Sequence, residues 1–509
     1  MTTPAVTTPR QEPPAERDAR RWWALGVIAL AQLMVVLDAT IVSIALPSAQ
    51  RDLGLTDGSR QWVVTAYTLA FGGLLLLGGR IADLVGRKHA FTSGLVGFAT
   101  ASALGGAATG PAMLFAARAL QGCFAALLAP SALSLLATTF TDGRERAKAF
   151  GIFGALAGAG GGMGLLLGGV LTQYLDWRWC LYVNVAIGAV AAAGAVAFLK
   201  DRAGHRAVRL DVPGAVLGCG GLVTVVYALS RAESDGWGSG TVAGLLVAGT
   251  ALLAGFTWWQ SRAAHPLLPL RIIATRAHGG PVLTLGLAMT GLFAVFLLLT
   301  YYLQDILGYS ALKSGFAFLP MSAAIVLTST QVSARLLPRV APRTMIVPGL
   351  AVAAAGMFTF TTLGTHSAYA THVLPGAVLL GSGMGLVFMP VMATATAGVA
   401  PGDAGTASAA VNTAQQVGGS LGTALLNTVA TTSTGHYVAA RLAAHGGDRV
   451  TAAQRHAITD AGVVHGFTTA FGWAGGLTLA GALVAALLVN VPSPRRRGGV
   501  LASKARAAA

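Results

Sequence analysis

Residues 35–47 read VVLDATIVSIALP, and one carboxylate, Asp38, stands within an apolar run that extends from Trp22 to Pro47. An apolar run of this length is typical of a helix that spans a membrane. An ionisable side chain inside such a helix is costly, which makes it a candidate functional group. This stretch therefore predicts a membrane protein with a buried acidic site.

The composition of the whole chain also indicates an integral membrane protein. Of its 509 residues, 54% are hydrophobic and only 10% are charged, whereas about a quarter of the residues in a soluble domain are charged. The net charge of +16 lies in short clusters between apolar segments, a distribution that argues against nucleic-acid binding. The three cysteines lie in apolar stretches without CxxC spacing and are expected to be packing residues: Cys123, Cys180 and Cys219.

Apolar segments of spanning length recur along almost the entire chain, and we predict about fourteen membrane-spanning helices. They are placed at residues 22–47, 61–79, 89–108, 112–137, 146–172, 179–199, 213–230, 240–260, 279–303, 314–337, 345–364, 372–396, 404–431 and 466–491. A polar, Pro-rich tail (1–21) precedes the first span, and a basic tail (492–509) follows the last. The expected fold class is all-α and multi-pass.

The basic residues predict the orientation of the chain in the membrane. If the N-terminus is cytoplasmic, 25 Lys and Arg residues fall in cytoplasmic loops and tails and eight in outer loops. Cytoplasmic loops of membrane proteins carry an excess of Lys and Arg. Both termini are therefore expected in the cytoplasm, with the protein in the cytoplasmic membrane.

Two short segments suggest an internal repeat. QRDLGLT (50–56) lies at the end of the first span, and QDILGYS (304–310) lies at the end of the ninth, on the same predicted side of the membrane. Chance similarity in a Gly- and Leu-rich chain is one explanation. Duplication is the other, and it predicts two six-helix halves with the seventh and eighth spans between them.

The sequence shows no machinery for catalysis or nucleotide hydrolysis. No Gly is followed by Lys, so a phosphate-binding GxxxxGK[ST] loop is absent, and the Gly-rich ALAGAGGGMG (155–164) lies inside a predicted span, where it indicates close helix packing. No HExxH motif or His/Cys ligand cluster occurs. The chain is expected to be no enzyme and to need no cofactor or metal, so an ion gradient must drive any transport.

Two charged residues lie well inside the predicted spans, Asp38 in the first and Arg118 in the fourth. Asp38 is nine residues from Pro47, and Arg118 is seven from Pro111. At 1.5 Å per residue both lie roughly 10–14 Å below the outer surface. A purely structural ion pair is one interpretation, and a proton-carrying carboxylate with an arginine partner is the other.

Several motifs resemble those of a known transporter family. GGRIADLVGRKHA (78–90) resembles the loop signature of the major facilitator superfamily, with Ile81 in place of the usual Leu. The segments similar to its fourteen-helix drug:proton antiporters are LDATIVSIALP (37–47), RALQG (118–122), DWRWCLYVNVAIG (176–188) and YYLQDILGYS (301–310). The resemblance covers nearly the whole chain.

The resemblance implies a fold and a function. It implies a six-helix bundle at 22–199, a linker with two extra helices at 200–278 and a second bundle at 279–491. It also implies proton-coupled export of amphipathic drugs or antibiotics by alternating access. Asp38 and Arg118 then take part in proton coupling. The loop residues latch the cytoplasmic helix ends: Gly79, Asp83, Gly86, Arg87 and Lys88.

One motif departs from the family pattern. The fifth-span antiporter motif, G-x-x-x-G-P-x-x-G-G, reads GGGMGLLLGG at 160–169. Its glycines are kept (Gly160, Gly164, Gly168 and Gly169), but Leu165 stands where Pro is usual. A Pro would kink the helix by removing a hydrogen bond, so this departure bears on the direction of exchange.

Polar and aromatic residues in otherwise apolar spans are candidates for lining a substrate cavity between the halves. They are Trp62, Tyr67, Gln121, Asn184, Tyr301, Tyr302, Asn412, Gln415 and Gln416. Because Asp38 is the one deep carboxylate, neutral or weakly charged amphipathic compounds fit at least as well as multivalent cations. The expected partners are this substrate, protons and lipid, for a protein acting as a monomer. The alternatives are an exporter of a lipid, siderophore or metabolite, and a non-transporting membrane sensor.

Overall fold

The computed structural model describes residues 14–140, 143–199, 211–264, 266–268, 270, 274–337, 339–396, 404–444 and 450–489, and within these residues it contains helices and no strand. The first six long helices follow the apolar runs of the N-terminal half. They are α1 (Pro14–Leu53), α2 (Trp62–Val85), α3 (Arg87–Gly106), α4 (Pro111–Thr139), α5 (Gly143–Tyr174) and α6 (Trp179–Phe198).

The remaining chain forms eight more long helices. Two lie between the halves, α7 (Val212–Asp235) and α8 (Gly240–Arg262). The last six are α10 (Arg276–Tyr301), α11 (Ala311–Leu327), α13 (Arg343–Thr359), α14 (Leu374–Thr396), α15 (Ala404–Ala444) and α16 (Ala452–Leu488). Short π-, 3-10 and α-helical segments extend some of them: η1 (Tyr302–Ile306), η2 (Thr328–Ser333), α12 (Ala334–Leu336), η3 (Phe360–Thr362) and η4 (Tyr369–Val373). The predicted all-α fold with fourteen long helices is confirmed.

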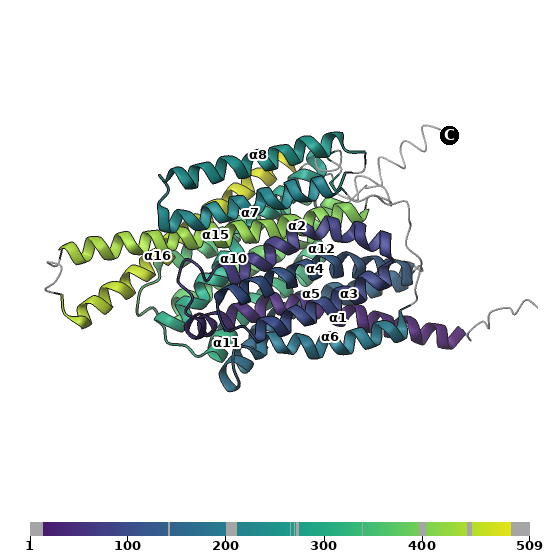
Figure 1. Cartoon of the computed structure of the whole chain (residues 1–509), viewed down its shortest axis with the longest axis horizontal. Helices are drawn as coiled ribbons and strands as arrows, with labels where there is room; N and C mark the ends of the chain where they lie inside the picture. Colours follow the sequence, from purple (N-terminus) through teal and green to yellow (C-terminus); the bar gives the residue numbers. More distant parts are fainter. Residues whose placement is uncertain are drawn as a thin grey trace, which may run out of the picture.

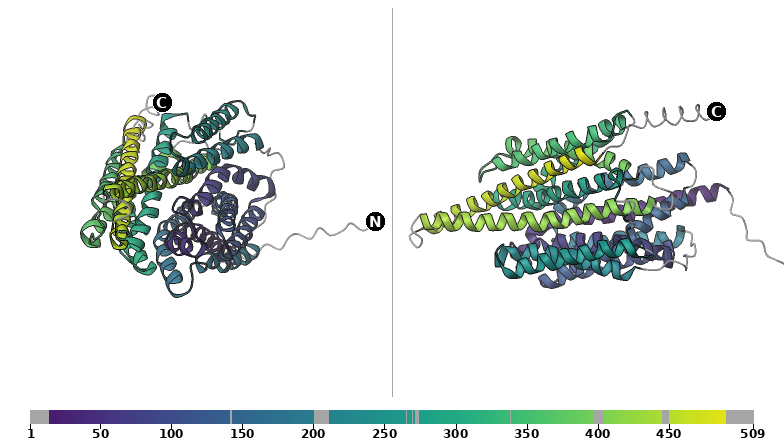
Figure 2. Two further views of the ribbon diagram at one scale, coloured as in Figure 1. Left: turned by 60° about the vertical axis from the view of Figure 1, so that its left-hand side comes forward. Right: turned by 90° about the horizontal axis from the view of Figure 1, so that it is seen from above.

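The long helices form two six-helix bundles with α7 and α8 beside them. In the first bundle α2 and α3 pack on α4, and α1 packs on α5 and α6; in the second α10 packs on α15 and α16, and α13 packs on α14. Figure 2 shows the purple-to-blue helices of the first bundle gathered beside the green-to-yellow helices of the second. Helix α7 packs on both α2 and α15, and α8 packs on α7 at the edge (Figure 1).

Eleven of these helices are long and apolar enough to cross a membrane by length and composition. The other three long helices are α3, α5 and α15, which have 20, 32 and 41 residues. Each runs alongside more apolar neighbours: α3 on α4, α5 on α1 and α15 on α10. The glycine and hydroxyl residues of α3 and α15 lower the mean hydropathy of these two helices.

We call the two ends of the bundle the near end and the far end. The near end holds the first turns of α1 and the α2–α3 junction at Gly86, and the far end holds the loop at residues 54–61 between α1 and α2. The repeat suggested by the sequence is visible in the backbone at the far end: Gly54 and Gly308, which occupy matching positions of the two similar segments, have φ values of +66° and +64°. Such values favour glycine. This shared geometry supports duplication over chance similarity.

The far end differs from the prediction in one respect. The spans placed at 404–431 and 466–491 were expected to be joined by a loop, but α15 continues to Ala444 and α16 already begins at Ala452. The two helices extend past the others as a hairpin (Figure 1). Gly462 and Gly466 of α16 allow close packing against Thr434 and Val438 of α15. Gly462 and Gly466 are four residues apart and lie on one face of α16, so α15 and α16 can pack against each other beyond the other helices.

Candidate functional site

The Asp38 carboxylate lies at the centre of a buried polar cluster in the first bundle. Arg118 of α4 donates from Nη1 to Asp38 Oδ2 at 2.6 Å. Asn184 of α6 and Gln121 of α4 donate to Asp38 Oδ1 at 2.7 and 3.1 Å. Asp38 and both amide residues are fully buried, and Arg118 is only 1% exposed. The predicted pair is thus in direct contact.

The arginine makes further contacts that hold it in place. Its Nε donates to the Val63 carbonyl of α2 at 2.9 Å, and its Nη1 also donates to Gln121 Oε1 at 2.8 Å. The guanidinium carbon lies 4.4 Å from the ring centroid of Tyr67, a cation–π distance. Ser102 of α3 accepts a hydrogen bond from Gln121 Nε2 at 2.6 Å. With Ser102 included, five helices contribute to the cluster.

The cluster gives both members of the buried ion pair several polar partners. A buried ion pair tolerates its desolvation only when further hydrogen bonds satisfy both partners, as they do here. If a proton neutralised Asp38, Arg118 would keep Val63 O, Gln121 Oε1 and the Tyr67 ring as partners. The cluster thus has alternative interactions for either protonation state of the carboxylate.

Three predicted cavity residues belong to this cluster. Gln121 and Asn184 are bonded to Asp38 and fully buried, so in this structure they do not line an open cavity. Tyr67 is 1% exposed beneath Arg118. Sequence reasoning missed Ser102, because a hydroxyl residue in a helix carries no distinguishing signal. Its contact with Gln121 depends on the packing of α3 on α4.

The remaining cavity candidates lie elsewhere. Tyr301 and Tyr302 are buried toward the far end, and Tyr302 donates to the Gly364 carbonyl at 2.7 Å. Trp62 packs against Tyr227 of α7. On α15, Asn412, Gln415 and Gln416 are partly buried, and Gly72 of α2 faces Gln416 so closely that a Cβ at Gly72 would lie 2.6 Å from the Gln416 Cβ. Gln416 thus lies where the halves meet.

The glycines of the 160–169 motif pack α5 against two neighbours. A Cβ at Gly160 would lie 3.1 Å from Val36 of α1, and one at Gly168 would lie 2.9 Å from the Ile41 carbonyl. At Gly164 it would collide with the Thr40 hydroxyl. Gly169 instead faces α11, where a Cβ would lie 2.7 Å from the Leu312 Cα. Leu165, in place of the usual Pro, is buried, and its carbonyl faces Gly315 of α11.

The 79–88 segment forms the α2–α3 junction at the near end. Gly86 has φ +95° and ψ 138°, a conformation that only glycine adopts readily, and its N–H bonds to the Ala82 carbonyl. Lys88 Nζ donates to the Val196 carbonyl in the last turn of α6 at 3.1 Å, where the helix dipole favours a cation. Arg87 opens α3, and Gly79 contacts Pro130 of α4. The Asp83 side chain lies outside the described part of the chain.

The two bundles meet toward the far end. Thr68 of α2 and Ser420 of α15 share a hydrogen bond of 2.7 Å, Gln304 of η1 donates to the Ile44 carbonyl at 3.0 Å, and Arg60 donates to Asn427 at 3.2 Å. Helix α5 packs on α11 through the glycines described above. These contacts close the far end of the seam between the bundles.

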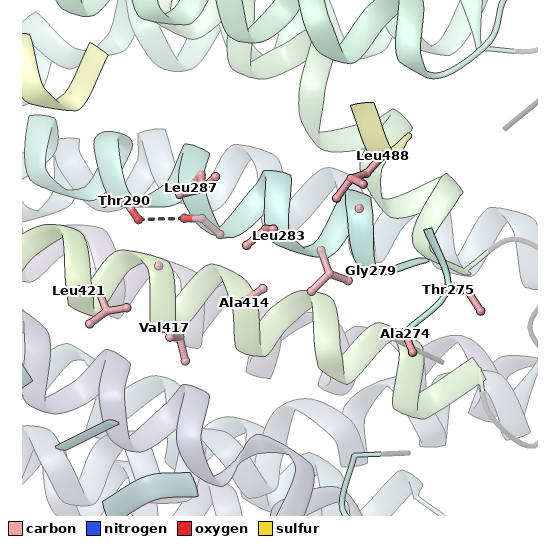
Figure 3. A pocket seen from close by; sticks show the side chains of 14 residues that line it. Ala274, Thr275, Gly279, Leu283, Leu287, Thr290, Ala414, Val417, Leu421 and Leu488 are labelled. Atoms are coloured by element: carbon pink, nitrogen blue, oxygen red, sulfur yellow. Dashed lines mark hydrogen bonds between the residues drawn. The ribbon is translucent and has the colours of Figure 1, made fainter. Parts of the chain in front are cut away.

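A separate apolar groove of about 600 Å³ lies between α10 and α15, with Leu488 of α16 at one end (Figure 3). Its walls include Leu283 and Leu287 of α10 and Val417 and Leu421 of α15. It contains none of the residues bonded to Asp38. Its lining matches the apolar part of an amphipathic molecule but offers no charged group.

Comparison with known proteins is consistent with this architecture. Residues 28–423 match the family model described as Major Facilitator Superfamily. The puromycin resistance protein pur8 of Streptomyces alboniger is 55% identical over 475 residues (93% of this chain and 92% of that protein). The cephamycin export protein CmcT of Amycolatopsis lactamdurans is 42% identical over 429 residues (84% and 88%).

Solved structures show the same fold at low sequence identity. A bacterial homologue of the human lysosomal transporter Spinster aligns with a TM-score of 0.63 at 14% identity, covering 92% of this chain and 96% of that one. A peptide transporter of the POT family aligns with a TM-score of 0.62 at 17% identity, covering 93% and 98%. The family model, the relatives and the fold agree, and the chain belongs to the Major Facilitator Superfamily.

Proposed function

We propose that this protein is a proton-coupled exporter of amphipathic antibiotics that works by alternating access. The similarity to the puromycin resistance and cephamycin export proteins supports antibiotic export, since each similarity covers more than four-fifths of both chains. The single observation that carries proton coupling is the fully buried Asp38, which contacts Arg118, Gln121 and Asn184 inside the first bundle.

The proposed orientation places the near end in the cytoplasm and the far end outside. The excess of Lys and Arg in the loops and tails of the near end supports both termini being cytoplasmic, in a cytoplasmic membrane. The proposed partners are protons, lipid and a small amphipathic molecule, with no nucleic acid or cofactor, and the protein acts as a monomer rather than as an enzyme. In this orientation the contacts at the far end close the outer side of the seam between the bundles.

The transport cycle follows from this geometry. In the outward-facing state Asp38 takes up a proton as the substrate leaves, and in the inward-facing state it releases the proton as new substrate binds. The described residues that bond to Asp38 belong to the first bundle, so its protonation is proposed to act on the seam mechanically. Helix α1, which carries Asp38, packs on α5 through Gly160, Gly164 and Gly168, and α5 packs on α11 of the second bundle.

The α2–α3 junction is the proposed cytoplasmic latch. Lys88 ties the start of α3 to the end of α6, and the Gly86 backbone turns the chain sharply between α2 and α3. Gly79, Asp83 and Arg87 complete the motif. The described contact lies within the first bundle, so the junction keeps that bundle rigid while it rocks against the second.

The substrate is proposed to be neutral or weakly charged, because Asp38 is already satisfied by three donors. The cavity is proposed to lie between the bundles, with Asn412, Gln415 and Gln416 of α15 and Trp62 of α2 as lining residues, and Leu165 and its neighbouring glycines at the α5 side.

Transport by purified protein in proteoliposomes tests this proposal. An imposed pH gradient should drive puromycin accumulation, and dissipating the gradient with a protonophore should stop it. A panel with cephamycin and tetracenomycin C then defines selectivity. If expression of the protein protects cells from none of these compounds, the antibiotic cargo is wrong and a lipid, siderophore or metabolite replaces it.

A further inference from the structure

A second buried arginine lies outside the Asp38 cluster. Arg60, in the loop between α1 and α2 at the far end, is only 5% exposed. Its Nη1 pairs with Asp57 of the same loop at 3.1 Å. The Asp57 side chain is 65% exposed, so the counter-charge of Arg60 remains in contact with solvent while the guanidinium is buried.

The guanidinium is buried by the second bundle. Its Nε donates to Asn427 Oδ1 of α15 at 3.2 Å, and its central carbon lies 3.8 Å from the Tyr301 ring centroid of α10 and 6.0 Å from that of Phe467 of α16. Asn427 is fully buried and donates in turn to the Asp57 carbonyl at 3.0 Å. Three helices of the second bundle therefore hold one side chain of the first.

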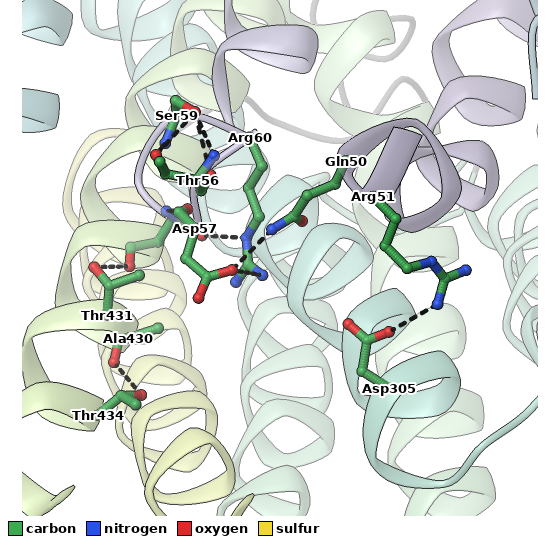
Figure 4. Close-up of polar contacts among 11 residues, drawn as sticks. Gln50, Arg51, Thr56, Asp57, Ser59, Arg60, Asp305, Ala430, Thr431 and Thr434 are labelled. Carbon is green, nitrogen blue, oxygen red and sulfur yellow. Dashed lines mark hydrogen bonds and ion pairs between the residues drawn. The ribbon is translucent and has the colours of Figure 1, made fainter. Parts of the chain in front are cut away.

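We propose that Arg60 is the residue that holds the outer side of the transporter closed in its inward-facing state. Figure 4 shows its head group beside Asp57 and Gln50, away from the Arg51–Asp305 pair. When the bundles separate at the far end, Arg60 loses Tyr301, Phe467 and Asn427 but keeps Asp57 and gains water. The closed state offers a desolvated cation–π contact and a charged hydrogen bond, and the open state offers hydration. The contacts of Arg60 with the second bundle thus favour the closed state, and water replaces them when the bundles separate.

A neighbouring pair provides an internal comparison. Arg51 of α1 reaches Asp305 of η1 at 3.9 Å across the same seam, but both side chains are largely exposed, at 69% and 43%. Exposed ion pairs contribute little. The two arginines have the same charge and lie on the same side of the protein, so burial against aromatic rings is the property that distinguishes them.

Substitutions at Tyr301 distinguish the contribution of its aromatic ring from that of its hydroxyl. The Tyr301 ring faces the guanidinium, and its buried hydroxyl lies near Arg60 but has no partner of good hydrogen-bond geometry among the described residues. Tyr301→Phe therefore keeps the cation–π contact, and Tyr301→Leu removes it. This pair of variants tests the contact without altering the charge of Arg60.

Cysteine labelling from the outside tests the assignment. In a chain with Cys123, Cys180 and Cys219 replaced by Ala and efflux retained, Ser420→Cys places a thiol in the seam beneath Arg60. Its reaction with a membrane-impermeant maleimide should be at least tenfold faster with Arg60→Gln or Tyr301→Leu; a tenfold change corresponds to about 1.4 kcal/mol. Arg51→Gln and Tyr301→Phe should keep the slow parental rate, and Arg60→Lys should fall between, because a lysine lacks the planar fork.

Equal labelling rates in the parent, Arg60→Gln and Tyr301→Leu would overturn the assignment. If Arg60→Gln does not reach the membrane, the two Tyr301 variants decide the question. The inference rests on the proposed alternating access, but labelling needs no cargo and no pH gradient. A failed substrate panel with accelerated labelling would therefore contradict the proposed cargo and leave the closing role of Arg60 supported.

Discussion

Arg118 donates to Asp38 across 2.6 Å, and every described hydrogen-bond partner of this pair belongs to the first bundle. The seam between the bundles, in contrast, is held by Arg60, Thr68 and Gln304 near the far end. The proposed proton site and the interface between the bundles are thus separate. Coupling between them requires a rigid connection, and the glycine-packed α1–α5 contact provides one.

Enlarging Gly164 should weaken this connection. A Cβ at Gly164 collides with the Thr40 hydroxyl and lies 2.9 Å from the Leu37 carbonyl, next to Asp38. Gly164→Ala should cost about 1–3 kcal/mol by overpacking and reduce gradient-driven transport at least tenfold. Gly161→Ala is the matched control, since its Cβ would lie 4.0 Å from the nearest atom. Equal transport rates for the two variants would show that the α1–α5 contact tolerates expansion.

The α2–α3 junction gives a second matched pair. Gly86→Ala places a side chain at φ +95°, which should cost about 1–3 kcal/mol, and thermal unfolding in detergent should show a lower melting temperature. Gly79→Ala adds a Cβ at 3.6 Å from Pro130, an ordinary contact, and should melt like the parent. If Gly86→Ala had the stability and turnover of the parent, the positive φ of Gly86 would not be required for the proposed latch.

Asp211 anchors the accessory helices at the near end. It accepts from the Gly214 amide and Trp259 at 2.9 and 2.7 Å and from Gln260 at 2.6 Å. Burial raises the pKa of Asp211, but these hydrogen bonds outweigh burial and hold the pKa below its usual value. The stabilisation is therefore present at neutral pH and is lost as the pH falls through the pKa of the folded state.

Asp211→Asn should lower the free energy of unfolding by about 1–3 kcal/mol at pH 7, because an amide N–H would face the donor of Gln260. The difference from the parent should hold from pH 7 down to about pH 4 and shrink below that, as the pH falls through the lowered pKa of the folded state. Asp235→Asn is the control at the other end of α7, where the partner is the exposed Arg231. A pH-independent difference would mean that shape rather than charge matters at Asp211.

Helix α8 should face lipid and not the substrate. Val247 is 70% exposed in the structure, and α8 packs mainly on α7. A thiol at Val247→Cys in the cysteine-free chain should react slowly with water-soluble maleimides despite this exposure, since lipid covers the position, and substrate should not change the rate. Protection of this thiol by substrate would place α8 on the transport pathway.

The sequence was sufficient to predict the helices, because each apolar run is bounded by charged or Gly- and Pro-rich loops. It also predicted the Asp38–Arg118 contact, since two charges at one depth in adjacent antiparallel helices have few other partners. It could not assign Gln121 and Asn184 to the carboxylate, because an amide in an apolar span has many possible partners and only the packing of α3, α4 and α6 selects one.

Arg60 was missed for a related reason. In the sequence it is one of the basic residues expected in an outer loop, and its burial depends on Tyr301, Asn427 and Phe467, which lie more than 200 residues away. The far-end extension of α15 and α16 was likewise hidden, since residues 432–465 are too polar for a span. Long-range packing, which local pattern does not encode, decides both features.

Uphill transport by Asp38→Asn tests proton coupling most directly. Parent and variant are reconstituted at equal density into proteoliposomes, and puromycin accumulation is measured under an imposed pH gradient. Asp305→Asn is the control, because Asp305 is a partly exposed acid outside the buried cluster. The variant's melting temperature is measured first, since Asp38→Asn leaves Arg118 without its counter-charge. We expect accumulation by the parent and by Asp305→Asn, and only downhill equilibration by Asp38→Asn. Undiminished accumulation by Asp38→Asn would remove this carboxylate from proton coupling.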